Sequence, residues 1–154
     1  DNKNRPLDDF EIKNVLSDFF DQKTLTMKLV KGAQSTLNNL SKFFEILILS
    51  NIPHKNYKLR KRALKENGIN FPFVSNSGEK GLIVNSITQN HPGVCWFIDD
   101  SPFQIKSVKK HSPSTQTIHF TQNKRLSDLM EDVKVSDNKA NTWKQLEFII
   151  LQSK

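Results

Sequence analysis

The chain has little cysteine and no long apolar run, and these two shortages exclude several classes of protein. Its 154 residues contain one cysteine, Cys95, so an internal disulfide cannot form. No apolar run approaches the roughly 20 residues that span a bilayer. The polar first residues, DNKNRPLDDF, lack the apolar region of a secretory signal. We therefore expect a soluble, cytoplasmic protein without a membrane segment.

Positive charge is in excess. The sequence has 23 Lys and Arg residues against 16 Asp and Glu residues, a formal net charge of +7. Part of this charge is concentrated between residues 55 and 65, in Lys55, Lys58, Arg60, Lys61, Arg62 and Lys65. We interpret this segment as the solvated face of a helix. The alternative is a surface that attracts phosphorylated substrates or nucleic acid.

Short apolar runs alternate with helical patterns along the chain. Apolar runs bounded by turn residues predict short strands at 45–50, 71–74, 94–98 and 117–120. Apolar residues spaced three and four apart, with cap signals, predict helices over 6–22, 34–44, 55–66, 81–89, 103–110, 125–132 and 140–151. This alternation predicts an α/β fold with a Rossmann-like, mostly parallel sheet flanked by helices.

Polar residues follow two of these strands directly. Ser50 and Asn51 end the first predicted strand, Asp99 and Asp100 end the third, and Lys80 lies in the loop between them in sequence. Ligands of open α/β sheets bind outside the carboxyl ends of the strands. The carboxylates suit Mg²⁺, and the ammonium and hydroxyl suit phosphoryl oxygens. The pattern therefore indicates a phosphate-and-metal site.

Each candidate also has a structural interpretation. Ser50 fits a turn or helix cap, Lys80 fits an exposed loop lysine, and one of the two aspartates fits a turn. The adjacent pair Asp99-Asp100 is the strongest functional signal, because two neighbouring acids repel each other and a bound cation relieves that repulsion. The four histidines have no zinc-ligand spacing, and Cys95 lies in an apolar strand, as a core residue would.

Three segments together resemble the motifs of the haloacid dehalogenase (HAD) superfamily. The segment 46–51 (ILILSN) resembles its second motif, 78–81 (GEKG) its third, and 96–102 (WFIDDSP) its fourth. Their order and spacing agree over about residues 25–151, and the wider segments resemble bacterial HAD-like proteins of unassigned substrate. The resemblance implies a phosphatase, a phosphoric monoester hydrolase that forms an aspartyl-phosphate on a small phosphorylated metabolite and requires Mg²⁺.

The resemblance also implies roles for individual residues. Ser50 binds the transferring phosphoryl group with Asn51 beside it, and Lys80 steadies the nucleophile and the phosphoryl charge. Asp99 binds Mg²⁺ directly, and Asp100 supports it directly or through water. The intact acidic pair disfavours a metal-free dehalogenase.

The superfamily's first motif, a strand ending in DxD, has no counterpart in these residues, so we assign no nucleophile. In the family topology that strand lies between the strands ending at Ser50 and Asp100, and we expect it in a preceding segment. Residues 1–30 are then interpreted as the helical remainder of a small cap or insertion, and residues 31–154 as the HAD-like core.

Two other functions remain open at this point. One is a catalytically inactive HAD-like binding or regulatory module. The other is a nucleic-acid-binding protein that uses the basic helix at 55–65, which we consider the weaker alternative. The sequence leaves the substrate and the oligomeric state undetermined.

Overall fold

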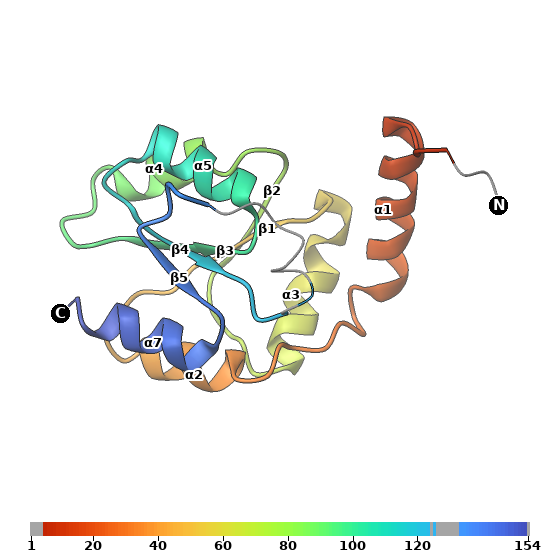
Figure 1. The fold of residues 1–154 in the computed structure, drawn as a ribbon. Helices are drawn as coiled ribbons and strands as arrows, with labels where there is room; N and C mark the ends of the chain where they lie inside the picture. Colours follow the sequence, from red (N-terminus) through yellow and green to blue (C-terminus); the bar gives the residue numbers. More distant parts are fainter. Residues whose placement is uncertain (1–4, 124, 126–132, 154) are drawn as a thin grey trace. The chain divides into compact units, whose positions relative to one another are not determined.

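The structure, a computed structural model, describes residues 5–123, 125 and 133–153 of the chain. The chain forms two compact units (Figure 1). Unit 1 consists of Asp1–Leu29 and Ile46–Ser77, and unit 2 of Val30–Glu45 and Gly78–Lys154. The backbone thus passes from one unit to the other after residues 29, 45 and 77.

Unit 1 contains a parallel two-stranded sheet. Strand β1 (Ile48–Asn51) pairs with β2 (Phe73–Asn76), so Ser50 lies opposite Ser75 and Asn51 opposite Asn76. The connection between the strands is helical, as parallel pairing requires. It consists of the 3₁₀ turn η1 (His54–Asn56) and helix α3 (Tyr57–Glu66). Buried apolar residues of the unit are Ile52, Ala63, Leu64, Ile69 and Phe73.

Helix α1 (Asp9–Lys23) precedes this sheet in unit 1. Its start is well specified, because the Asp8 side chain accepts a hydrogen bond from the Glu11 amide at 2.8 Å and the Glu11 side chain accepts one from the Asp8 amide at 3.0 Å. This reciprocal capping box satisfies amide groups that the first turn of a helix leaves without partners. No residue of α1 is buried.

Unit 2 contains a parallel three-stranded sheet in the order β3–β4–β5. Its strands are β3 (Trp96–Asp99), β4 (Gln116–Phe120) and β5 (Asn138–Ala140). Its helices are α2 (Ala33–Leu40), α4 (Gly81–Thr88), α5 (Pro102–His111) and α7 (Trp143–Leu151). Figure 1 shows α4 and α5 on one face of the sheet and α2 and α7 on the other. The residues buried between these layers include Ile105, Val108, Ile118, Leu146 and Ile150.

Local sequence signals explain where the helices of unit 2 begin and end. Pro102 occupies the first turn of α5, where a missing amide hydrogen costs nothing, and Lys109, Lys110 and His111 lie in its last turn, where cations interact favourably with the helix dipole. Thr142 caps α7 by accepting a hydrogen bond from the Gln145 amide at 3.2 Å.

The predicted α/β class is confirmed: the described strands form short parallel ladders of two and three strands, flanked by helices. The predicted helix over 34–44 ends at Leu40, and the predicted helix over 140–151 begins at Trp143 because Thr142 caps it. Strand β5 was missed, since three residues with a central lysine give no strand pattern. The helix predicted over 125–132 lies outside the described residues apart from residue 125.

Membrane-spanning helices were not expected, and none of the described helices has the length and apolar character that a bilayer crossing requires.

Candidate functional site

A buried ion pair joins Lys80 to the carboxyl end of β3. Lys80 Nζ donates to Asp99 Oδ2 at 2.7 Å, and the two side chains are only 10% and 8% exposed. The Lys80 ammonium also lies 5.9 Å from the centre of the Phe97 ring. Removing one member of such a buried pair would leave the other charge buried and without compensation. The pair therefore fixes the loop before α4 against the end of the sheet.

Helix α5 holds Lys80 from the other side. The Lys80 amide donates to Gln104 Oε1 at 2.8 Å, and Gln104 Nε2 donates back to the Gly78 carbonyl at 3.1 Å. Gln104 is itself buried, so both ends of its amide are used inside the protein. These two bonds hold the segment from Gly78 to Lys80 in one conformation and leave the lysine side chain directed at Asp99.

The next residue, Gly81, brings α4 unusually close to α5. Its amide donates to Ser107 Oγ at 3.1 Å, and the same hydroxyl donates to Glu79 Oε2 at 3.0 Å. A Cβ atom at position 81 would lie 2.3 Å from the Ser107 carbonyl oxygen, which is closer than atoms can approach. Only glycine therefore fits here without a shift of one helix.

Asp100 lies beside the buried pair and is more exposed than Asp99. Partial burial of its carboxyl raises the pKa of Asp100, and the negative charge of Asp99 raises it further. The Asp100 carbonyl lies 3.0 Å from His119 Nε2 on the neighbouring strand β4. The site thus combines the Asp99 carboxylate, which is held by Lys80, with the adjacent Asp100 carboxyl. Ionisation of Asp100 is disfavoured because it would place a second negative charge beside Asp99.

The donor set at this strand end fits a hard divalent cation. Asp99 Oδ1 accepts the Ser101 amide at 2.9 Å and Oδ2 accepts Lys80, but each carboxylate oxygen has a second lone pair. Mg²⁺ is commonly held by one or two protein carboxylates, with water and substrate phosphate completing its shell. Asp99 and Asp100 place two carboxylates next to each other in the sequence at this strand end. Among the described residues, no three His, Cys, Asp or Glu side chains come together as a metal cluster.

The other predicted residues, Ser50 and Asn51, lie in unit 1 at the carboxyl end of β1. Asn76 Nδ2 donates to Asn51 Oδ1 at 2.9 Å, and His54 Nδ1 lies 2.7 Å from Ser75 Oγ. Parallel pairing places Ser50 level with Ser75, so polar side chains of both strands gather at one edge. This second cluster offers hydroxyl, amide and imidazole groups and no carboxylate.

The structure therefore brings together Lys80, Asp99 and Asp100 in unit 2, and it places Ser50 and Asn51 in unit 1. Sequence reasoning missed Gln104 and Ser107, which position the lysine loop. Gln104 and Ser107 are three residues apart and lie on the face of α5 that also carries buried Ile105 and Val108. Polar residues interrupting an apolar helical face were the available signal. Cys95, predicted to be a core residue, is only half-buried, and burial raises the pKa of its thiol.

The basic segment at 55–65 is partly engaged within unit 1. Lys55 Nζ lies 2.7 Å from Asp21 Oδ2, and Arg62 Nε lies 3.4 Å from Glu66 Oε1. Lys61 Nζ lies 6.0 Å from the centre of the Tyr57 ring. Burial lowers the pKa of Arg60. These contacts use several of the cations locally and weaken the interpretation of the segment as a nucleic-acid surface.

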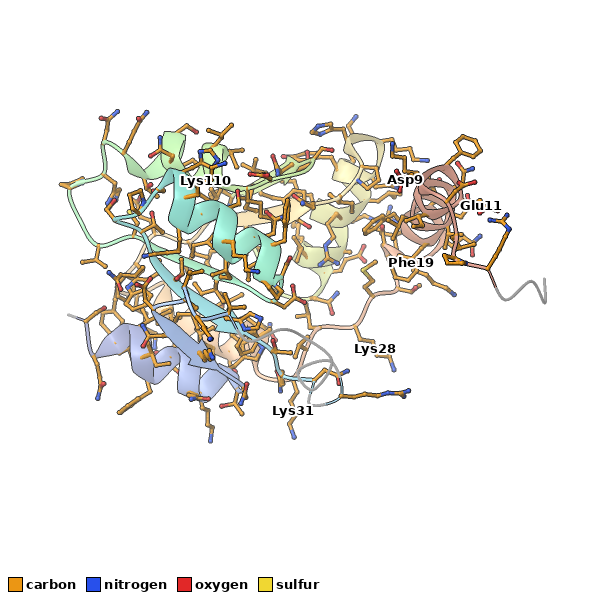
Figure 2. The ribbon with its side chains drawn as sticks, turned by 45° about the horizontal axis from the view of Figure 1, so that its top comes forward. Asp9, Glu11, Phe19, Lys28, Lys31 and Lys110 are labelled. Atoms are coloured by element: carbon orange, nitrogen blue, oxygen red, sulfur yellow. The ribbon has the colours of Figure 1, made fainter. Side chains whose placement is uncertain are left out.

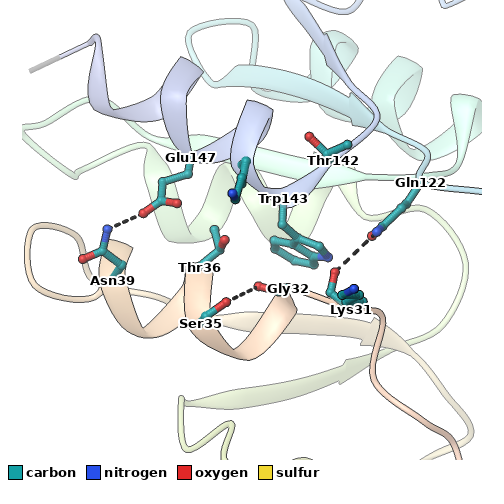
Figure 3. A pocket seen from close by; sticks show the side chains of 10 residues that line it. Lys31, Gly32, Ser35, Thr36, Asn39, Gln122, Thr142, Trp143 and Glu147 are labelled. Atoms are coloured by element: carbon teal, nitrogen blue, oxygen red, sulfur yellow. Dashed lines mark hydrogen bonds between the residues drawn. The ribbon is translucent and has the colours of Figure 1, made fainter.

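A shallow pocket of about 450 Å³ lies between α2 and α7 in unit 2 (Figure 3). Hydrogen bonds link residues of its lining, from Gln122 Nε2 to the Lys31 carbonyl at 3.4 Å and between Asn39 and Glu147. The indole nitrogen of Trp143, which also lines it, is buried and has no hydrogen-bond partner among the described residues. None of the five predicted site residues contributes to this pocket.

Comparison of the chain with protein-family models and with curated proteins finds no match.

Proposed function

We propose that this chain carries the phosphate- and metal-binding groups of a HAD-like phosphatase acting on a small phosphorylated metabolite. The observation that carries the proposal is the buried contact of 2.7 Å between Lys80 Nζ and Asp99 Oδ2, directly beside Asp100 at the end of a parallel strand. The three motif-like segments supply the order of these groups along the chain, and the contact brings together residues of the third and fourth segments only.

Each residue has a distinct task under this proposal. Lys80, held by Gln104, presents a fixed positive charge where a phosphoryl oxygen would sit. The resemblance implies that Ser50 Oγ and Asn51, in unit 1, donate hydrogen bonds to phosphoryl oxygens. Asp99 and Asp100 would hold Mg²⁺, which supplies charge neutralisation for the phosphoryl group when bound. The attacking carboxylate is not assigned to any residue of this sequence.

The strand pairing supports the same proposal. The superfamily topology requires one more strand between those that carry the second and fourth motifs. Within the described residues, β1 pairs only with β2, and β3 pairs only with β4. Each motif-bearing strand thus has one side without a strand partner in the described part of the chain, as that topology requires.

The test uses the native protein, with any segment that its gene encodes before these residues, and measures hydrolysis of a generic aryl phosphate with and without Mg²⁺. We expect metal-dependent turnover that falls about 100-fold or more in Asp100→Asn, because a ligand and its charge are lost while the buried pair stays intact. Asp99→Asn and Lys80→Met should lose turnover as well. Since these two changes disturb a buried ion pair, circular dichroism must first show that both variants fold.

Lys110→Ala is the matched control, because this lysine of α5, labelled in Figure 2, is exposed. Its turnover should equal that of the unmodified protein. Turnover that is independent of Mg²⁺, or that survives Asp100→Asn, would contradict the proposal. Binding of Mg²⁺ and inorganic phosphate without any turnover would favour the inactive binding module instead.

A further inference from the structure

Helix α1 turns its polar side toward the rest of unit 1. Lys55 Nζ, in η1, donates to Ser17 Oγ at 2.8 Å and to Asp21 Oδ2 at 2.7 Å. Asn56 Nδ2 donates to Asp21 Oδ1 at 2.7 Å. A surface helix normally buries its apolar stripe and exposes its polar side. In α1 the arrangement is reversed.

The opposite side of α1 carries a continuous apolar stripe. Ile12, Val15, Leu16 and Phe19 follow the i, i+3, i+4, i+7 spacing that places residues on one helix face. Their exposed fractions are 42%, 56%, 50% and 47%. Figure 2 labels Phe19 of this stripe, with Asp9 and Glu11 of the first turn. Single exposed apolar residues are ordinary, but four on one face mark an interaction surface.

The charges at the two ends of α1 indicate what covers the stripe. The first turn carries Asp9 and Glu11, and the last turn carries Lys23. Arg5 already pairs with Glu11 at 2.6 Å. Within the described part of the chain, Asp9 and Lys23 form no ion pair. Each therefore keeps its charge available for a partner.

The charges and the apolar stripe of α1 complement those of a second α1 that runs in the opposite direction. Position 16 lies midway between 9 and 23 and inside the stripe, so two antiparallel copies of α1 centred there place each Asp9 beside the other copy's Lys23. A parallel pair would place like charges side by side instead. Two-fold pairing of this kind uses the same patch on both copies and closes after two subunits.

We propose that the α1 stripe is covered by α1 of a second copy of this chain, in an antiparallel two-fold dimer. Ile12 then packs against Phe19 of the other copy, and Val15 against Leu16. The stripe supplies the apolar centre of the contact, and the two Asp9–Lys23 pairs set its direction. This inference is independent of the proposed phosphatase function.

Sedimentation velocity over a range of protein concentrations tests the proposal. We expect a reversible monomer–dimer equilibrium whose dissociation constant rises by at least about 30-fold in Leu16→Glu, since each dimer would bury two uncompensated charges. Phe10→Ser is the matched control, because Phe10 is 72% exposed and lies nine residues, two and a half turns, from Phe19 on the other side of α1. This control should leave the equilibrium unchanged.

A charge exchange tests the direction of the pairing. Lys23→Glu should weaken the dimer about 5- to 10-fold, and adding Asp9→Lys to it should restore most of the loss. A protein that stays monomeric at every concentration would overturn the proposal. So would a dimer that resists Leu16→Glu in a folded protein, or a double variant that is weaker than Lys23→Glu alone.

Discussion

Asp137, just before β5, collects several hydrogen bonds on one carboxylate. Lys109 Nζ donates to its two oxygens at 3.1 and 3.0 Å, and the amide and hydroxyl of Thr117 donate to Oδ2 at 2.8 Å each. Burial raises the pKa of Asp137, but the Lys109 and Thr117 bonds outweigh it and leave the pKa below its usual value of 3.8. The carboxylate thus ties β4 and the C-terminal end of α5 to the segment entering β5.

Ionisation of the Asp137 carboxylate should make the free energy of unfolding depend on pH in the acid range. A depressed native pKa favours the ionised form in the folded state, so its stabilisation is complete above the unfolded value near 3.8 and is lost as the pH falls through the native pKa. Asp137→Asn should lower the free energy of unfolding at neutral pH by about 1–3 kcal/mol and flatten the stability curve in acid. Urea unfolding at neutral pH and near pH 3 measures both effects.

Asp18→Asn on α1 is the control for this change, because Asp18 is exposed and forms no ion pair among the described residues. Its unfolding free energy should stay within about 0.5 kcal/mol of the unmodified protein. Equal losses in the two variants would show that the Asp137 bonds contribute little.

At the scale of elements, the approach of α4 to α5 depends on one missing methyl group. A Cβ at Gly81 would lie 2.3 Å from the Ser107 carbonyl oxygen and 2.6 Å from its hydroxyl oxygen. Replacing an unstrained helical glycine with alanine ordinarily stabilises a protein by about 0.4–1 kcal/mol. Here the helices must separate, so Gly81→Ala should lower the free energy of unfolding by about 1–3 kcal/mol.

Chemical denaturation measures this loss, and Gly93→Ala is the control. A Cβ at Gly93 would meet only the His91 side chain, 3.3 Å away, and that ring can move. We expect a change within about 0.5 kcal/mol for the control. Stabilisation of the protein by Gly81→Ala would refute the steric account.

The contrast between strands and helices explains what could be predicted from the sequence. The apolar runs that end near Asn51 and Asp99 predicted where two strands end. Asp99 and Asp100 were therefore placed correctly at the end of β3. The contact of Gln104 with Lys80 depends on how α5 crosses α4, and side-chain spacing within one helix carries no information about its neighbour. The pairing of β4 with β5 could likewise not be predicted, because local patterns predict strands but not which of them pair.

At the scale of the whole molecule, the net charge of +7 predicts a general attraction to polyanions. Lys55 and Arg62 of the basic segment are already paired with acids. We therefore expect weak binding of single-stranded DNA, without sequence preference, that falls steeply as salt is raised toward physiological strength. Fluorescence titration of labelled oligonucleotides at two salt concentrations measures it. Tight binding with a marked sequence preference at physiological salt would restore the nucleic-acid alternative.

The interleaved path of the chain has a consequence for dividing the gene. Residues 30–45 belong to the unit formed mainly by residues 78–154, although residues 46–77 of the other unit separate them in sequence. A fragment cut at residue 78 would therefore lack α2, which packs against α7 and carries buried Ala33 and Leu40. The C-terminal half would be expressed with an uncovered helix and would be prone to aggregate. A genetic split that respects the fold has to join 30–45 to 78–154 through a linker.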